Sequence, residues 1–111
     1  MSTFTIVITH APYGQEKAFT ALRFVQSAFK HQVNVFLVED GVFVAKKGQG
    51  SDLGIEDMLR DAIHSGVTVR LCGSCAAARG LGPSELVEGA AIGSMEDLVR
   101  WVDECDKVLM F

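Results

Sequence analysis

The sequence lacks the features that mark membrane, secreted and nucleic-acid-binding proteins. No apolar run approaches the ~20 residues that a helix needs to cross a bilayer. The first residues, MSTFTIVITHAP, contain neither a basic region ahead of a long apolar core nor a small-residue cleavage site, so they do not form a secretory signal. The net charge is −4, and the basic pair Lys46-Lys47 is too short to form a patch for nucleic acid. We therefore expect a cytoplasmic protein that binds neither nucleic acid nor a membrane.

The motifs of nucleotide and zinc sites are also missing. Neither G-x-x-x-x-G-K-[ST] nor G-x-G-x-x-G follows the first apolar run. A structural zinc site needs four ligands, but the chain has one Cys-x-x-Cys, Cys72 with Cys75, and no His-x-x-x-His. We therefore expect no cofactor and no metal. Cys105 makes three cysteines, an odd number, and in a reducing cytosol we expect all three to be thiols.

Length and composition predict one domain, spanning residues 1–111, with a hydrophobic core. Of the 111 residues, 49% are hydrophobic, which is enough for a core without disulfide or metal staples. Strand-like β-branched runs alternate with segments whose apolar residues recur every three or four positions. The strand-like runs are 4–9, 33–38, 67–71 and 107–111, with a shorter one within 89–93, and the helical segments are 15–30, 55–65 and 94–105. This alternation predicts a flavodoxin-like, three-layer α/β/α fold with a mostly parallel sheet of about five strands.

Two helical segments have apolar faces that we expect to turn toward the sheet. The inward residues are Ala18, Leu22, Val25 and Phe29 in the first, and Leu98, Val99 and Val102 in the last. Ser94 is a good N-cap for the last segment, and Asp97 can complete a capping box with it. Residues 46–54, KKGQGSDLG, hold three glycines without periodicity, so we expect a loop there.

Chemically capable residues follow three of the predicted strands. His10 comes after the first, Glu39 and Asp40 after the second, and Cys72 after the third. If these strands are parallel, their carboxyl ends share one edge of the sheet, where ligands and reactive groups collect. Residues that are distant in sequence therefore meet in one possible site. Asp40 and Gly41 are expected to form a turn.

The segment 67–81, VTVRLCGSCAAARGL, places a thiol where a strand ends and a helix begins. The free N–H groups and positive end of such a helix favour an anion, which for Cys72 is the nucleophilic thiolate, and Arg79 adds a cation. A small buried cysteine that closes a strand is the alternative. His10 can donate or accept a proton near the thiol, or can be a loop histidine bonded to backbone.

The same segment carries a family resemblance. Residues 72–81, CGSCAAARGL, resemble the cysteine segment of the DsrE/DsrF/TusD sulfur-relay family, in which stand-alone members often read Cys-Gly-x-Cys followed by Arg-Gly. Further similar motifs follow in the same order along nearly the whole chain. They are HAPY at 10–13, VFLVEDGV at 35–42, SMEDL at 94–98 and DKVLMF at 106–111.

The resemblance implies that the protein handles sulfur. Cys72 aligns with the family cysteine that carries a persulfide, and Arg79-Gly80 lie at the family's distance from it. The expected function is to accept sulfane sulfur on Cys72 and to pass it to an acceptor thiol, as a sulfurtransferase-like carrier. Its expected partners are donor and acceptor proteins or small thiols. The resemblance also implies homo-oligomers, commonly trimers or hexamers.

The function of Cys75 and the alternatives to a carrier stay open at this level. Cys75 can resolve or protect sulfur on Cys72, or can only pack, since subunits of the relay complexes have alanine there. One alternative function is a non-enzymatic binding or assembly module whose cysteines are incidental. The other is a dithiol redox protein that uses Cys72 and Cys75.

Overall fold

The structure, a computed structural model, describes residues 1–50 and 52–111. Its strands are β1 (Thr3–Ile8), β2 (Gln32–Leu37), β3 (Thr68–Cys72), β4 (Ala91–Gly93) and β5 (Lys107–Met110). They form one five-stranded sheet in the order β4-β3-β2-β1-β5, and every neighbouring pair is parallel. The predicted parallel sheet of about five strands is therefore confirmed.

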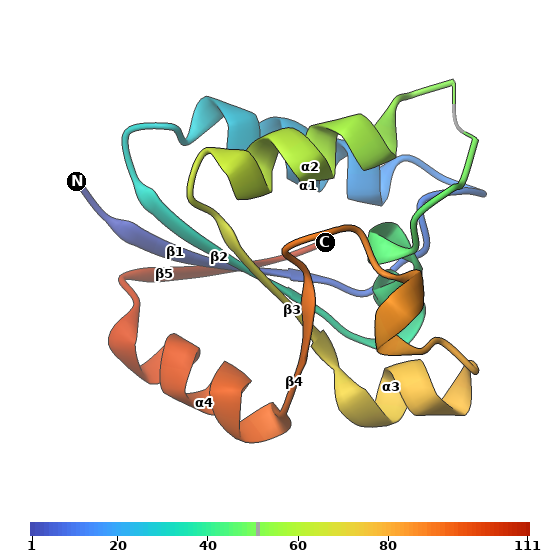
Figure 1. Ribbon diagram of the computed structural model, residues 1–111. Coiled ribbons are helices and arrows are strands. Elements are labelled where there is room, and N and C mark those ends of the chain that lie inside the picture. Colours follow the sequence, from blue (N-terminus) through green and yellow to red (C-terminus); the bar gives the residue numbers. More distant parts are fainter. Residues whose placement is uncertain (51) are drawn as a thin grey trace.

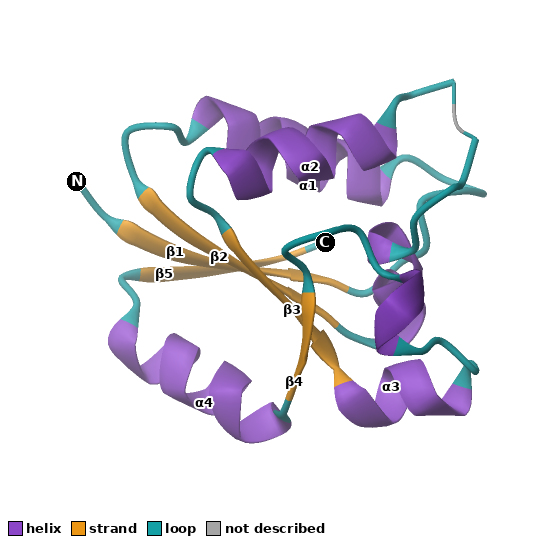
Figure 2. Ribbon diagram, in the orientation of Figure 1, coloured by secondary structure: helices purple, strands orange, loops and turns teal. Residues whose placement is uncertain are grey.

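Helices cover both faces of this sheet (Figures 1 and 2). The α-helices are α1 (Lys17–Ser27), α2 (Ile55–His64), α3 (Gly73–Ala78) and α4 (Met95–Glu104), and the 3₁₀ helices are η1 (Glu39–Ala45) and η2 (Pro83–Glu85). In Figure 1, α1 and α2 lie above the sheet and α3 and α4 lie below it, so the predicted three-layer α/β/α arrangement is confirmed. No helix in the described part of the chain is long and apolar enough to span a membrane.

The main hydrophobic core lies between the sheet and the α1/α2 layer. Alternate strand residues point toward these helices, as the pleat of a strand requires. Fully buried members of this core are Ile6, Ile8, Val35, Leu37, Val69 and Leu71 from the strands, and Leu22 and Leu59 from the helices. Burial of a side chain of this size stabilises the fold by about 1.5–3 kcal/mol, so this layer is the main source of stability.

The α4 layer is less complete than predicted. Ser94 caps α4, because its Oγ accepts from the Asp97 N–H at 3.2 Å while its own N–H donates to the Asp97 carboxylate at 2.9 Å. The inward placement of Val99 and Val102 is wrong, however: these side chains are 63% and 44% exposed. Leu98 is half-buried, and the Trp101 ring meets buried Phe36 edge to face, with centroids 5.9 Å apart. The helix therefore presents Leu98 and Trp101 to the sheet and a second apolar stripe to the outside.

Three other predicted segments have different outcomes. The first helix ends at Ser27 rather than at Lys30, so Phe29 no longer follows its 3.6-residue period and is 78% exposed instead of buried. Part of the loop predicted for residues 46–54 falls on Ser51, which lies outside the described residues. The helix α2 ends as expected, because Gly66 follows its C-cap with φ +108°, a conformation that favours glycine.

Candidate functional site

The sheet order decides which of the predicted residues meet at its carboxyl edge. Strand β2 adjoins β3, so Glu39 and Asp40, which begin η1 after β2, lie beside Cys72, the last residue of β3. His10 follows β1, which is one strand further away, and neighbouring strands lie about 4.8 Å apart. Its Nδ1 shares a 2.9 Å hydrogen bond with the Thr9 hydroxyl. At this edge Cys72 therefore lies closer to the acidic turn, Glu39 and Asp40, than to His10.

Cys72 is a buried thiol with several hydrogen-bond donors around it. It is the N-cap residue of α3 and only 4% exposed, and its Sγ lies 3.3 Å from the Ser74 hydroxyl. Burial acts to raise the pKa of this thiol, but hydrogen bonds from the Ser74 and Cys75 side chains and from their backbone N–H groups outweigh it. The net effect lowers the pKa of Cys72 below its ordinary value of 9.0. Because α3 has six residues, these individual donors rather than a long helix dipole favour the thiolate.

Cys75 has the opposite tendency. It is the third residue of α3 and is half-buried. Burial raises the pKa of its thiol, and the hydrogen bond that it makes to Cys72 raises the pKa further. The Glu39 backbone N–H and the Arg79 charge offset part of this effect. The two thiols therefore differ in character: Cys72 favours the thiolate, while Cys75 favours the protonated form that donates to it.

The turn that supports Cys75 has a constrained backbone. Glu39 has φ +53°, a left-handed conformation that residues with a side chain seldom adopt. Two residues later, a Cβ at Gly41 would collide with the carbonyl oxygen of Ile8, so only glycine lets η1 pack this closely on the end of β1. The packing of η1 thus fixes the backbone at Glu39, whose N–H lowers the pKa of the Cys75 thiol.

Arg79 joins the acidic turn to α3. Its Nε donates to the Asp40 carboxylate at 2.9 Å, and its Nη1 donates to the Cys75 carbonyl at 3.1 Å. Among the described residues, Arg79 therefore bonds to Asp40 and Cys75. The predicted contact of Arg79 with an anion on Cys72 is not among these bonds. A negative carboxylate near a thiol opposes formation of the thiolate. The Arg79 guanidinium balances the charge of the Asp40 carboxylate.

Two residues contribute to this site in ways that the sequence motifs do not indicate. Ser74 is absent from the predicted site, although a hydroxyl two residues after a candidate thiolate can donate to it. Glu39 was expected at this edge, but nothing local in the sequence predicts a left-handed glutamate. The Ser74 hydroxyl lies 3.3 Å from the Cys72 sulfur, and the Glu39 N–H lowers the pKa of Cys75.

The third thiol lies outside this group. Cys105 is the C-cap residue of α4, and its Sγ approaches the Val102 carbonyl oxygen at 3.5 Å. Cys105 is half-buried, and all three cysteines are free thiols. Within residues 1–50 and 52–111, His, Cys, Asp and Glu side chains form no group of three that could hold a metal ion.

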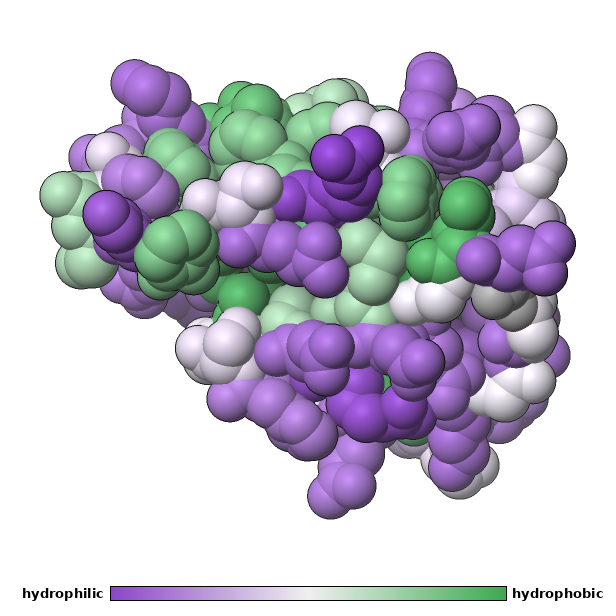
Figure 3. All heavy atoms as spheres, turned by 90° about the horizontal axis from the view of Figure 1, so that it is seen from above, coloured by the Kyte–Doolittle hydropathy of each residue, from purple (hydrophilic) through white to green (hydrophobic). Residues whose placement is uncertain are grey.

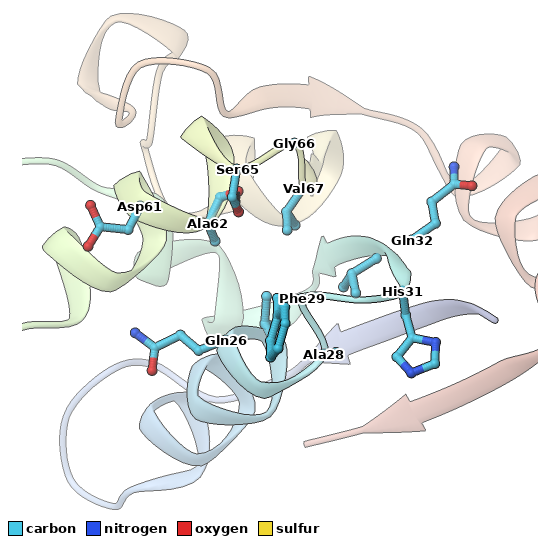
Figure 4. A pocket seen from close by; sticks show the side chains of 12 residues that line it. Gln26, Ala28, Phe29, His31, Gln32, Asp61, Ala62, Ser65, Gly66 and Val67 are labelled. Atoms are coloured by element: carbon cyan, nitrogen blue, oxygen red, sulfur yellow. Dashed lines mark hydrogen bonds between the residues drawn. The ribbon is translucent and has the colours of Figure 1, made fainter. Parts of the chain in front are cut away.

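A separate cavity of about 310 Å³ opens at the opposite edge of the sheet (Figure 4). It lies where α1 and α2 end and where β2 and β3 begin, and Figure 4 shows Phe29, Asp61 and Val67 around it. Figure 3, which looks down on the α1/α2 face, shows apolar side chains exposed among polar ones. Cys72 lies five positions after Val67, about 16 Å of extended chain. The cavity lining contains no thiol, so the cavity is separate from the candidate cysteine site.

Comparisons by sequence and by structure both find relatives that match nearly the whole chain. The chain is 46% identical over 112 residues to protein MJ0989 of Methanocaldococcus jannaschii, covering 97% of this chain and 98% of that protein. It is 45% identical over 115 residues to protein MK0008 of Methanopyrus kandleri, covering 100% and 95%. Protein YchN of Escherichia coli is 34% identical over 117 residues, with full coverage of both chains.

The structural neighbours extend these relationships. The crystal structure of YchN from E. coli superposes on the whole chain with a TM-score of 0.91 at 33% identity. The protein MTH1491 of Methanobacterium thermoautotrophicum superposes over both full chains with a TM-score of 0.83 at 17% identity, which supports the fold alone. The DsrE/DsrF-like family model matches residues 2–111. The chain therefore belongs to the DsrE/DsrF-like family.

Proposed function

We propose that this protein accepts sulfane sulfur as a persulfide on Cys72 and passes it to an acceptor thiol. Membership of the DsrE/DsrF-like family suggests a role of the sulfur-relay type. The observation that carries the finer proposal is the environment of Cys72, where the Ser74 hydroxyl at 3.3 Å and nearby N–H groups lower the thiol pKa despite burial. A thiolate is the reactive form in sulfur exchange.

The proposed reaction has two exchange steps. The Cys72 thiolate attacks the outer sulfur of a donor persulfide, R–S–SH, so that a new S–S bond forms while the donor bond breaks and R–S⁻ leaves. An acceptor thiolate then attacks the outer sulfur of Cys72–S–SH, and Cys72 leaves as a thiolate. Each step exchanges one S–S bond for another, so the overall transfer needs no metal, nucleotide or further oxidant.

Within this proposal the remaining site residues support Cys72. Arg79 acts as a positioning residue through Asp40 and the Cys75 carbonyl. His10 exchanges protons at the same edge, and its contribution is tested by the pH profile of sulfur uptake in His10→Ala. The proposal places the protein in the cytoplasm, where a reducing environment keeps thiols available.

Intact-protein mass spectrometry tests the proposal. Wild type, Cys72→Ser and the matched control Cys105→Ser are incubated with a small-molecule persulfide and sampled within seconds to minutes. We expect a gain of about 32 Da, one sulfur, in wild type and in Cys105→Ser, reversed by a reducing thiol. Cys72→Ser should show no gain at this site. Equal uptake in folded Cys72→Ser, or no uptake with several donors in both wild type and Cys75→Ser, would overturn the carrier.

We further propose that the protein assembles as a homo-oligomer, a trimer or a hexamer. The support is the set of apolar side chains left open on the α4 layer and on the outer strands: Ile92, Met95, Val99, Val102, Val108 and Met110. Exposed large apolar side chains in such number are typical of an interaction surface. Light scattering coupled to size exclusion should give three or six times the 12.0 kDa chain mass, and Val99→Asp should lower it. A wild-type monomer at micromolar concentration would contradict this.

Two other functions have an observation in their favour. The open apolar layer also suits a binding or assembly module with incidental cysteines, in which case Cys72→Ser would retain full biological activity. The closeness of Cys75 to Cys72 suits a dithiol redox protein. That function requires a reversible Cys72–Cys75 disulfide that forms in a glutathione redox buffer without any persulfide. A redox titration followed by mass spectrometry measures whether this disulfide forms.

A further inference from the structure

The two thiols of the site occupy positions that face each other across one helical turn. Cys72 is the N-cap of α3 and Cys75 is the third helical residue. In a capping box the side chains of these two positions reach toward each other's backbone, so the spacing brings both sulfurs to the same turn. The opposite pKa shifts of the two thiols, to which each side chain contributes in the other, agree with this placement.

Cys75 is also held in place by the neighbouring strand end. Arg79 joins the Cys75 carbonyl to the Asp40 carboxylate, at 3.1 and 2.9 Å. The adjacent Glu39 has a left-handed conformation, which persists only where the surrounding structure imposes it, and its N–H lowers the pKa of the Cys75 thiol. The segment of η1 beside Cys75 is therefore fixed in place.

We infer that Cys75 is a resolving thiol, which discharges the sulfur on Cys72 as hydrosulfide when no acceptor thiol takes it. The inference rests on the proposed persulfide at Cys72. The Cys75 proton passes to the outer sulfur of the persulfide, which leaves Cys75 as the attacking thiolate. Cys75 Sγ then attacks Cys72 Sγ, a Cys72–Cys75 disulfide forms, and the bond between Cys72 Sγ and the outer sulfur breaks. Overall, Cys72–S–S⁻ plus HS–Cys75 gives Cys72–S–S–Cys75 plus HS⁻.

The electrons in this step balance without an added oxidant. The sulfane sulfur gains two electrons and becomes sulfide, while each cysteine sulfur gives up one. Hydrosulfide is the conjugate base of a stronger acid than a cysteine thiol, so it is the better leaving group. The disulfide is then reduced by two equivalents of a small thiol, which restores both cysteines.

Access to the site favours an internal acceptor. Cys72 is 4% exposed, whereas Cys75 is half-buried and lies nearer the surface. An external thiol therefore reaches the Cys75 sulfur of a disulfide more easily than it reaches Cys72 Sγ. A neighbour held within the same turn also reacts without the loss of translational freedom that a separate molecule must undergo.

Single-turnover sulfide release tests the inference. Wild type, Cys75→Ser and Cys105→Ser are treated with a limiting small-molecule persulfide, freed of excess donor by rapid desalting, and followed by a sulfide assay and by intact mass. In wild type and Cys105→Ser we expect about one equivalent of sulfide, with loss of the added ~32 Da and a final mass about 2 Da below the dithiol. Cys75→Ser should keep the added sulfur and release sulfide at least about tenfold more slowly.

The outcomes separate this inference from the carrier proposal. Stable loading of both wild type and Cys75→Ser, without sulfide release, overturns the resolving thiol and leaves the carrier intact. Transfer of the added sulfur to the Cys75 peptide, again without sulfide, also overturns it. Failure of wild type and Cys75→Ser alike to load at any time point overturns the carrier and this inference with it. Circular dichroism and thermal melting of Cys75→Ser show that the variant is folded.

Discussion

The two faces of the sheet differ in how completely they are covered. On the α1/α2 face, Leu22 and Leu59 are fully buried against the strands. On the opposite face, α4 has no buried residue, and only Leu98 and Trp101 turn toward the sheet among its large apolar side chains. The last residue of β3, Cys72, alternates with core residue Leu71 and therefore points to this second face. One face thus supplies stability, and the other presents the thiol and an open apolar surface.

The largest expected effect compares one residue from each face. Leu59→Ala should lower the free energy of unfolding by about 2–5 kcal/mol, the range found when a buried leucine is truncated to alanine, because it leaves a cavity beneath α2. Val99→Ala should change it by no more than about 0.5 kcal/mol in the monomer, since the side chain is exposed. Urea unfolding at low protein concentration measures both values. Similar decreases in the free energy of unfolding of the two variants would mean that the two faces of the sheet contribute equally to stability.

A smaller effect is expected at the anchor of α4. Trp101→Ala removes the edge-to-face contact with Phe36. Because the Trp101 ring is half-buried, its loss should lower the free energy of unfolding by about 1–3 kcal/mol, less than the roughly 3–5 kcal/mol lost with a fully buried aromatic ring. Hydrogen exchange should then increase in residues 95–104 before it does in α1 or α2. Trp101→Phe is the matched control, because it keeps an aromatic ring. Uniform destabilisation of all helices would mean that α4 is not a separately anchored layer.

The next prediction concerns the thiol on the second face. Ser74→Ala removes the donor at 3.3 Å from Cys72, so the pKa of Cys72 should rise. Alkylation of Cys72 in a Cys75→Ser, Cys105→Ser background should then need higher pH for half-maximal rate, while Ser74→Thr should stay close to the parent. The depressed pKa also favours folding above the pKa of the unfolded thiol, and this contribution falls as pH drops through the folded pKa. An unchanged midpoint would exclude Ser74 as a donor.

The smallest effect is expected at the ion pair between η1 and α3. Asp40→Asn should reduce the unfolding free energy by about 0.2–1 kcal/mol, because the Asp40 carboxylate is largely exposed and screened by water. The loss should shrink further at 1 M salt, where screening is stronger. The pair between Arg100 and Asp97 within α4 offers a control of the same type. A loss well above 1 kcal/mol would show that the turn depends on this contact more than its exposure suggests.

The sequence predicts the helices on the two faces of the sheet with different success. Helix α2 was placed within one residue, because its apolar period, its glycine stop and its burial all agree. Helix α4 was placed equally well by its Ser94 cap, yet its buried face was wrong. Its apolar residues occupy more positions than one face can bury, and a period alone does not say which of two apolar stripes meets the sheet.

The site shows the same division. The position of Cys72 at a strand-to-helix junction, and its meeting with residues after β2, followed from alternation and parallel strands. The contact of Arg79 with Asp40 and Cys75 did not follow, because these partners are brought together only when η1 packs beside α3. The direction of each thiol's pKa likewise depends on donors whose positions the sequence does not state.

The sequence by itself determined the class of fold, the limits of most helices and strands, the family and the candidate thiol, because these depend on local periodicity, capping and motif order. The tertiary structure decided the strand order, which places Glu39 and Asp40 rather than His10 beside the cysteines. It also decided that Glu39 adopts a left-handed conformation and that Val99 stays exposed. These outcomes depend on contacts between segments far apart in the chain, where packing overrides the preference of any single residue.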